Sequence, residues 1–100
     1  MHITFVKKIL TNGELCQKCH DVSDRLESEG VLPLINRICV ADERDSNSEG
    51  MLLAKQYQVE RAPFFLAENE SGEVTVYDVY FKLKKTLIEK GLLPEKPSKI

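Results

Sequence analysis

The sequence predicts an α/β domain in which helices cover both faces of a mixed four-stranded sheet. The chain has 100 residues, 42% of them apolar, which suffices for one hydrophobic core in a single domain. Strand-like and helix-like segments follow one another in the order β-α-β-α-β-β-α. A strand, a crossover helix and a second strand form a parallel pair, whereas the later strand–turn–strand forms a hairpin, so we expect a mixed sheet.

A change of hydrophobic period marks the first strand and the first helix. Residues 3–10 are rich in β-branched and apolar side chains, as strands are, and Thr-Asn-Gly at 11–13 has the composition of a turn. Between residues 17 and 29, apolar side chains recur every three or four positions, which predicts a helix that ends before Gly30. We expect its inward-facing residues to be Cys19, Val22 and Leu26.

The second strand and helix follow a short loop. Residues 35–41 are mostly apolar, as expected for a strand covered on both faces. We interpret the charged segment 42–45 as a solvated loop. Ser46 and Glu49 have the spacing of a capping box, which predicts a helix from there to about Tyr57. The residues expected to face inward from this helix are Met51, Leu52, Ala54 and Tyr57.

A hairpin and a last helix complete the predicted domain. Residues 64–67, which follow Pro63, and residues 73–79 are predicted strands, joined by a turn at 69–72. The apolar spacing in residues 82–90 predicts a helix. Its inward residues are expected to be Leu83, Leu87 and Ile88.

Charge and composition exclude several classes of function. The formal net charge is −2 and no basic stripe indicates nucleic-acid binding. No apolar run approaches the roughly 18 residues that a membrane span needs. At the N-terminus the apolar residues precede the lysines, the reverse of a signal peptide. We therefore expect a cytoplasmic protein with a domain at 1–92 and a flexible C-terminal tail at 93–100.

The clearest chemical motif is Cys-Gln-Lys-Cys at residues 16–19. In the cytoplasm such a pair is more often catalytic or metal-binding than structural. Residues three apart on a helix's first turn lie on one side, about 5 Å apart at Cα, a separation that a disulfide accepts. Because a helix N-terminus favours a thiolate, we expect Cys16 to attack disulfides with a lowered pKa and Cys19 to resolve them. Lys18 and His20, if charged, would lower the Cys16 pKa as well.

Other chemistries of these cysteines stay open. Residues 16–20 also match the C-x-x-C-H signature of covalent c-type haem attachment, which needs export and usually a mostly helical fold. A zinc site could combine Cys16 and Cys19 with Cys39 and with His2 or His20, although a second paired-ligand motif is missing. Because Cys39 lies inside a predicted strand, we interpret it as a buried apolar side chain.

The chain resembles the thioredoxin-like superfamily over nearly all its ordered length. The order of elements is that of the family's minimal fold, as in glutaredoxins, and the C-x-x-C lies between the first strand and the first helix. Residues 57–66, Tyr-Gln-Val-Glu-Arg-Ala-Pro-Phe-Phe-Leu, are similar to the family's segment that ends in a cis-proline before the third strand. A C-x-x-C alone is weak evidence, but its combination with this proline is specific.

The resemblance implies a thiol–disulfide oxidoreductase that reduces or exchanges protein disulfides. Cys16 and Cys19 would be its catalytic residues, and Ala62 and Pro63 would bind the backbone of the substrate. No metal or organic cofactor is expected. The expected partners of this monomer are protein disulfides or small thiols together with an electron donor. The alternative is a binding or redox-sensing module of the same fold with little turnover.

Overall fold

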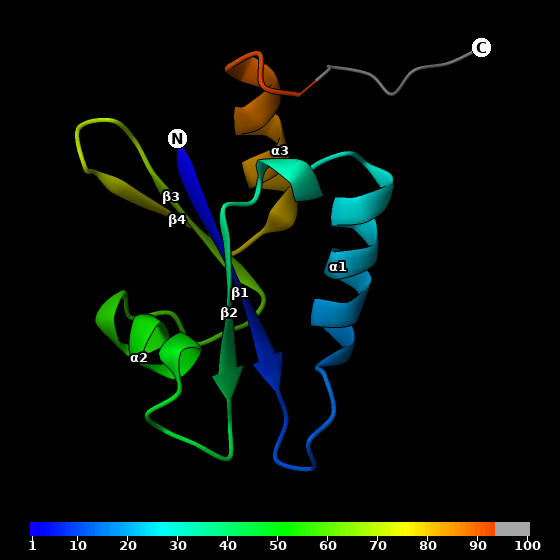
Figure 1. Ribbon diagram of the computed structural model, residues 1–100, viewed down its shortest axis with the longest axis vertical. Helices are drawn as coiled ribbons and strands as arrows, with labels where there is room; N and C mark the ends of the chain where they lie inside the picture. The colour runs from blue at the N-terminus through cyan, green and yellow to red at the C-terminus, as the bar shows by residue number, and fades with distance from the viewer. Residues whose placement is uncertain (94–100) are drawn as a thin grey trace.

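A computed structural model describes residues 1–93 as a four-stranded sheet with three α-helices and one short 3-10 helix (Figure 1). The elements are β1 (His2–Ile9), α1 (Gln17–Ser28), η1 (Leu32–Leu34), β2 (Arg37–Asp42), α2 (Glu49–Gln56), β3 (Phe64–Glu68), β4 (Val74–Tyr77) and α3 (Tyr80–Glu89). The predicted order is confirmed, with boundaries that differ by a few residues. Leu93, assigned above to the tail, is buried in the core, and the rest of that tail lies outside the described residues.

The sheet is mixed, as predicted, with the strand order β2-β1-β3-β4. β1 runs parallel to β2 and antiparallel to β3, and β3 is antiparallel to β4. Val6 lies opposite Phe64 in the pairing of β1 with β3. The C-terminal ends of β1 and β2 and the beginning of β3 therefore meet at one end of the sheet.

Two hydrophobic cores lie on opposite faces of the sheet, so the prediction of helices on both faces is confirmed. Figure 1 shows α1 and α3 on one side of the strands and α2 on the other. The core beneath α1 and α3 includes Phe5 and Phe65, whose stacked rings have centroids 5.0 Å apart. Its buried helical residues are Leu26, Tyr80, Leu83 and Leu87. The buried residues beneath α2 are Val6, Cys39, Ala41, Phe64 and Leu66.

The capping box predicted for α2 is wrong. The helix begins at Glu49, its N-cap is Ser48 rather than Ser46, and among the described residues no side chain caps it by a hydrogen bond. The Ser48 hydroxyl instead accepts a bond from the Asp42 N–H (3.0 Å) and donates to the Asp42 carbonyl (3.4 Å). This hydroxyl therefore ties the start of α2 to the end of β2.

The inward face of α2 agrees with the predicted one at Met51, Ala54 and Tyr57, which pack against the core, but differs at Leu52. A Cβ added to the buried Gly50 would lie 2.3 Å from the backbone nitrogen of Ala41, so the helix backbone packs directly on β2. This close approach turns Gly50, Leu53 and Ala54 toward the sheet, since residues three and four apart share a helix face. Leu52, predicted to face inward, is 50% exposed, and that prediction is wrong.

A polar cluster joins the C-terminal end of α1 to α3. The Glu29 carboxylate accepts a hydrogen bond from the Tyr80 hydroxyl (2.7 Å) and forms ion pairs with Lys84 and Arg25, each 3.2 Å away. Partial burial works to raise the pKa of Glu29, but these three donors outweigh it and hold the pKa below its ordinary value. The cluster fixes the far end of α1, the end that does not carry the cysteines.

α2 ends with Gln58 in a left-handed conformation. Its backbone angle φ is +56°, a value that residues other than glycine rarely adopt. The Val59 N–H donates to the Ala54 carbonyl (2.8 Å) and the Gln58 N–H donates to the Lys55 carbonyl (3.3 Å), the pattern of a Schellman motif. Glycine is the residue usually found at this position of the motif.

We therefore expect Gln58→Gly to raise the free energy of unfolding by about 0.5–1 kcal/mol, the relief of left-handed strain less the backbone entropy of glycine. The measurement is urea unfolding followed by circular dichroism. Gln56→Gly, the same substitution two residues earlier at a helical position, should lower that free energy by about 0.5–1 kcal/mol. Losses of stability in both variants would contradict the expectation.

Candidate dithiol site

The loop after β1 folds back and places Cys16 beside the end of that strand. The Leu10 N–H donates to the Glu14 carbonyl (2.8 Å), and Ile9 forms an isolated antiparallel bridge with Leu15. The Cys16 N–H then donates to the Lys8 carbonyl (3.0 Å). The turn predicted at residues 11–13 is present, but the sequence pattern did not indicate that the chain after it pairs with β1.

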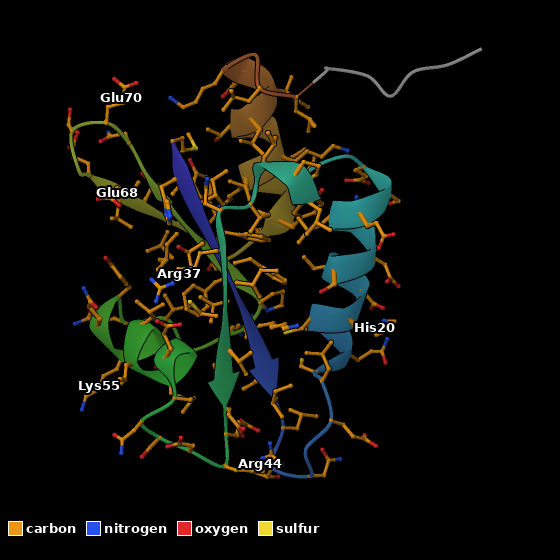
Figure 2. All side chains as sticks on the ribbon, in the orientation of Figure 1. His20, Arg37, Arg44, Lys55, Glu68 and Glu70 are labelled. Atoms are coloured by element: carbon orange, nitrogen blue, oxygen red, sulfur yellow. The ribbon has the colours of Figure 1, made fainter. Side chains whose placement is uncertain are left out.

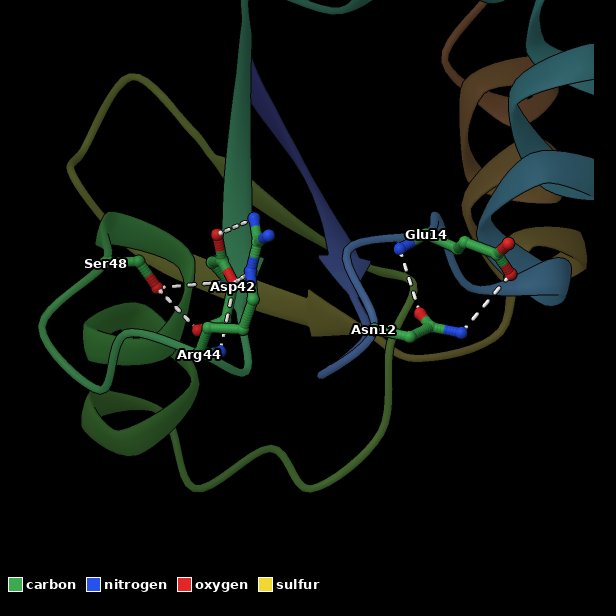
Figure 3. Close-up of polar contacts among 5 residues, drawn as sticks. All are labelled: Asn12, Glu14, Asp42, Arg44 and Ser48. Atoms are coloured by element: carbon green, nitrogen blue, oxygen red, sulfur yellow. Dashed lines mark hydrogen bonds and ion pairs between the residues drawn. The ribbon is translucent and has the colours of Figure 1, made fainter.

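The loop after β2 lies against this fold-back. The Asp42 carboxylate accepts three bonds of 2.9 Å from Arg44, through its backbone N–H, Nε and Nη2, and these hold the pKa of Asp42 at about 2. A Cβ added at Gly13 would lie 3.0 Å from Arg44 Nη1, so the guanidinium lies next to that glycine. Figure 3 shows both loops at one end of the sheet, with Asn12 bonded to Glu14 in the first.

Cys16 is the N-cap residue of α1 and is partly exposed. Its carbonyl accepts the first helical bond, from the His20 N–H (3.0 Å). Partial burial works to raise the pKa of the Cys16 thiol, but the N–H groups of Cys19 and Lys18, the Cys19 thiol and the Lys8 ammonium together lower it below the ordinary 9.0. Within the described residues the thiol makes no capping hydrogen bond, so these N–H groups act by their proximity.

Cys19 lies one turn deeper in α1 and is completely buried. Its Sγ accepts a hydrogen bond of 3.2 Å from the Lys8 N–H. Burial raises the pKa of Cys19 to about 11, and the nearby Cys16 contributes in the same direction, while Lys8 opposes them. The site therefore combines a partly exposed thiol with a lowered pKa and a buried thiol with a raised pKa.

Lys18 and His20 were both expected to lower the Cys16 pKa through the charge of their side chains. Lys18 contributes to the lowered pKa through its backbone N–H. The His20 ring lies on the outer side of α1, where its Nδ1 is 3.5 Å from Asp24 Oδ2 (Figure 2). Tuning by these two side chains remains a prediction.

Sequence reasoning missed Lys8, whose ammonium contributes to the lowered pKa of Cys16 and partly opposes the rise in the pKa of Cys19. No motif spacing could have indicated this lysine, because the fold-back of the loop at 10–16 brings it to the dithiol. Sequence reasoning also treated Glu43 as part of a solvated loop. In the structure Glu43 Oε2 lies 3.2 Å from Lys8 Nζ.

Ala62 and Pro63 lie at the same end of the sheet as the cysteines. The peptide bond between them is cis, as the resemblance implied, and Pro63 directly precedes β3. Since β3 begins opposite Val6, near the end of β1, this segment lies toward the end of the sheet at which α1 starts. Ala62 lines a cavity of about 210 Å³ together with Lys8 and Glu43. Their role in substrate binding remains a prediction.

The zinc ligands considered above are not brought together. In residues 1–93, no three His, Cys, Asp or Glu side chains converge in a group that could hold a metal ion. Cys39 is buried beneath α2, on the face of the sheet opposite α1, and its burial raises its pKa. His2 begins β1, at the end of the strand far from Cys16. The interpretation of Cys39 as a buried apolar side chain agrees with this position.

Comparisons of the chain with protein-family models, curated protein sequences and solved structures find no match. Among the described residues, no helix is both long and apolar enough to cross a membrane.

We expect Cys16 to be alkylated first when the native reduced protein is treated with iodoacetamide. Because its pKa is lowered, its rate should rise with pH through a midpoint below 9.0, whereas Cys19 should ionise only near pH 11. Mass spectrometry of the digested protein measures each site separately. Cys16→Ser should leave a protein that reacts slowly until it is unfolded. Equal native rates at Cys16 and Cys19 would contradict the assignment.

Proposed function

We propose that the chain is a thiol–disulfide oxidoreductase of the thioredoxin-like type. The observation that carries the proposal is the asymmetry of the dithiol: Cys16 is accessible with a lowered pKa, and Cys19 is buried with a pKa of about 11. A dithiol that exchanges with protein disulfides needs one sulfur that attacks from the surface and a second that waits in the protonated form.

In the first step the Cys16 thiolate attacks one sulfur of a substrate disulfide. A bond forms between Cys16 Sγ and that sulfur while the substrate S–S bond breaks. The second substrate sulfur leaves as a thiolate and takes a proton from water. The N-terminal N–H groups of α1 stabilise the negative charge of this thiolate, which contributes to the lowered pKa of Cys16.

In the second step Cys19 loses its proton to solvent and attacks Cys16 Sγ, releasing the first substrate sulfur as a thiol. Two electrons have then passed to the substrate, and a Cys16–Cys19 disulfide remains for a small-molecule thiol to reduce. The negative charge of Cys16 contributes to the raised pKa of Cys19. Because that charge disappears when Cys16 enters the mixed disulfide, Cys19 becomes easier to ionise when it must react.

The fold supports the same function. The element order, the dithiol at the start of α1 and the position of the Ala62–Pro63 segment at the same end agree with the thioredoxin-like resemblance. Ala62 would offer its main-chain groups to an extended substrate segment beside Cys16. Pro63 has no N–H of its own to donate to that segment.

The experiment is reduction of insulin disulfides by the purified protein with dithiothreitol as the final reductant. Cys16→Ser should abolish turnover, because it removes the attacking sulfur. Cys19→Ser should also lose turnover yet accumulate a mixed disulfide between Cys16 and the substrate. Cys39→Ser, which changes a buried cysteine on the other face of the sheet, is the matched control and should retain activity.

A folded wild-type protein that accelerates no exchange would contradict the enzymatic proposal. That result would instead favour a binding or redox-sensing module of the same fold. Turnover that survives Cys16→Ser would contradict the assignment of the attacking sulfur.

A further inference from the structure

The main chain of Lys8 is hydrogen-bonded to both cysteine residues. Its N–H donates to Cys19 Sγ (3.2 Å), and its carbonyl accepts the bond from the Cys16 N–H (3.0 Å). Lys8 is therefore held beside the dithiol by its backbone, whatever its side chain does.

The Lys8 side chain is paired rather than free in solvent. Its Nζ lies 3.2 Å from Glu43 Oε2, with side-chain exposures of 28% for Lys8 and 31% for Glu43. The Glu43 N–H donates to the Ile9 carbonyl (2.9 Å), so the main chain of Glu43 is held at the same end of β1. Backbone hydrogen bonds hold the main chains of both partners at this end of β1.

The pair lines the cavity that Ala62 also borders. This cavity, about 210 Å³ in volume, has an apolar wall from α2 and β3 that includes Met51 and Phe64. The remaining charged residues that line it are Glu60 and Arg61, which carry opposite charges. Lys8 and Glu43 therefore interact in surroundings that screen their charges less than open water does.

We propose that the Lys8–Glu43 ion pair controls the charge state of the dithiol, with Lys8 favouring the Cys16 thiolate and Glu43 restraining that effect. The inference rests on the proposed oxidoreductase function and adds its electrostatic control. Both residues act through Cys16 and are positioning residues.

The two residues should have opposite effects. The positive charge of Lys8 stabilises a nearby thiolate, in agreement with its contribution to the lowered pKa of Cys16. Glu43 neutralises part of that charge, and without Lys8 its own negative charge would disfavour the thiolate. Because a stabilised thiolate stabilises the reduced dithiol, Lys8 should also make the protein more oxidising.

The test is titration of the Cys16 thiolate by its ultraviolet absorbance in a Cys39→Ser background. Lys8→Met should raise the Cys16 pKa and reduce alkylation at neutral pH severalfold, whereas Lys8→Arg, which keeps the charge, should preserve both. Glu43→Gln should lower that pKa. Adding Glu43→Gln to Lys8→Met should bring the pKa back down from its value in the single variant.

Two control variants separate this pair from other nearby lysines. Lys7→Met changes the neighbouring lysine of β1, whose side chain points to the α1 face of the sheet, whereas that of Lys8 points to the α2 face, because strand side chains alternate. Lys18→Met changes the lysine of the motif itself. Neither should shift the Cys16 pKa as Lys8→Met does. An unchanged pKa in Lys8→Met, or an equal shift in Lys7→Met, would overturn the inference.

Equilibration with mixtures of reduced and oxidised glutathione supplies a second readout. Lys8→Met should shift the dithiol toward the disulfide, so that the variant is more reducing than the wild-type protein. The titration requires no turnover. A normal Lys8 effect in a protein that fails to reduce insulin would therefore contradict the proposed function alone.

Discussion

The engagement of the end of β1 by both cysteine residues is the constraint on which the site depends. The Lys8 N–H donates to Cys19 Sγ and the Lys8 carbonyl accepts from the Cys16 N–H, so the main chain of one residue sets the position of both cysteines. β1 itself pairs with a strand on each side and has a hydrophobic core on each face. A strand held in this way cannot shift without loss of packing, and the dithiol takes its precision from that rigidity.

The difference between the two thiols follows from their depth in the first turn of α1. Cys16 lies at the N-cap, where N–H groups without helical partners stabilise a negative charge. Cys19 points into the protein, where burial disfavours the same charge. Residues that are neighbours in the motif therefore receive opposite influences, which is the division of roles that thiol–disulfide exchange requires.

The packing of α2 on β2 determines where Glu43 lies. Gly50 lets the helix backbone approach Ala41, and Ser48 is bonded to Asp42 at the end of the strand. The chain that leaves β2 is thereby guided past the end of β1, where the Glu43 N–H bonds to Ile9. Packing on the face opposite α1 thus helps to place the carboxylate that pairs with Lys8.

The sequence by itself determined the order of the elements, the mixed sheet and the positions of Cys16 and Cys19 on the first turn of a helix. These features are local, because hydrophobic period, turn composition and residue spacing act over a few positions. Only the tertiary structure decided the exposure of Leu52 on α2, the bonds of Ser48 and the pairing of Lys8 with Glu43 near the end of β1. They depend on how closely two backbones approach and which strand ends meet, and no pattern within one segment encodes that.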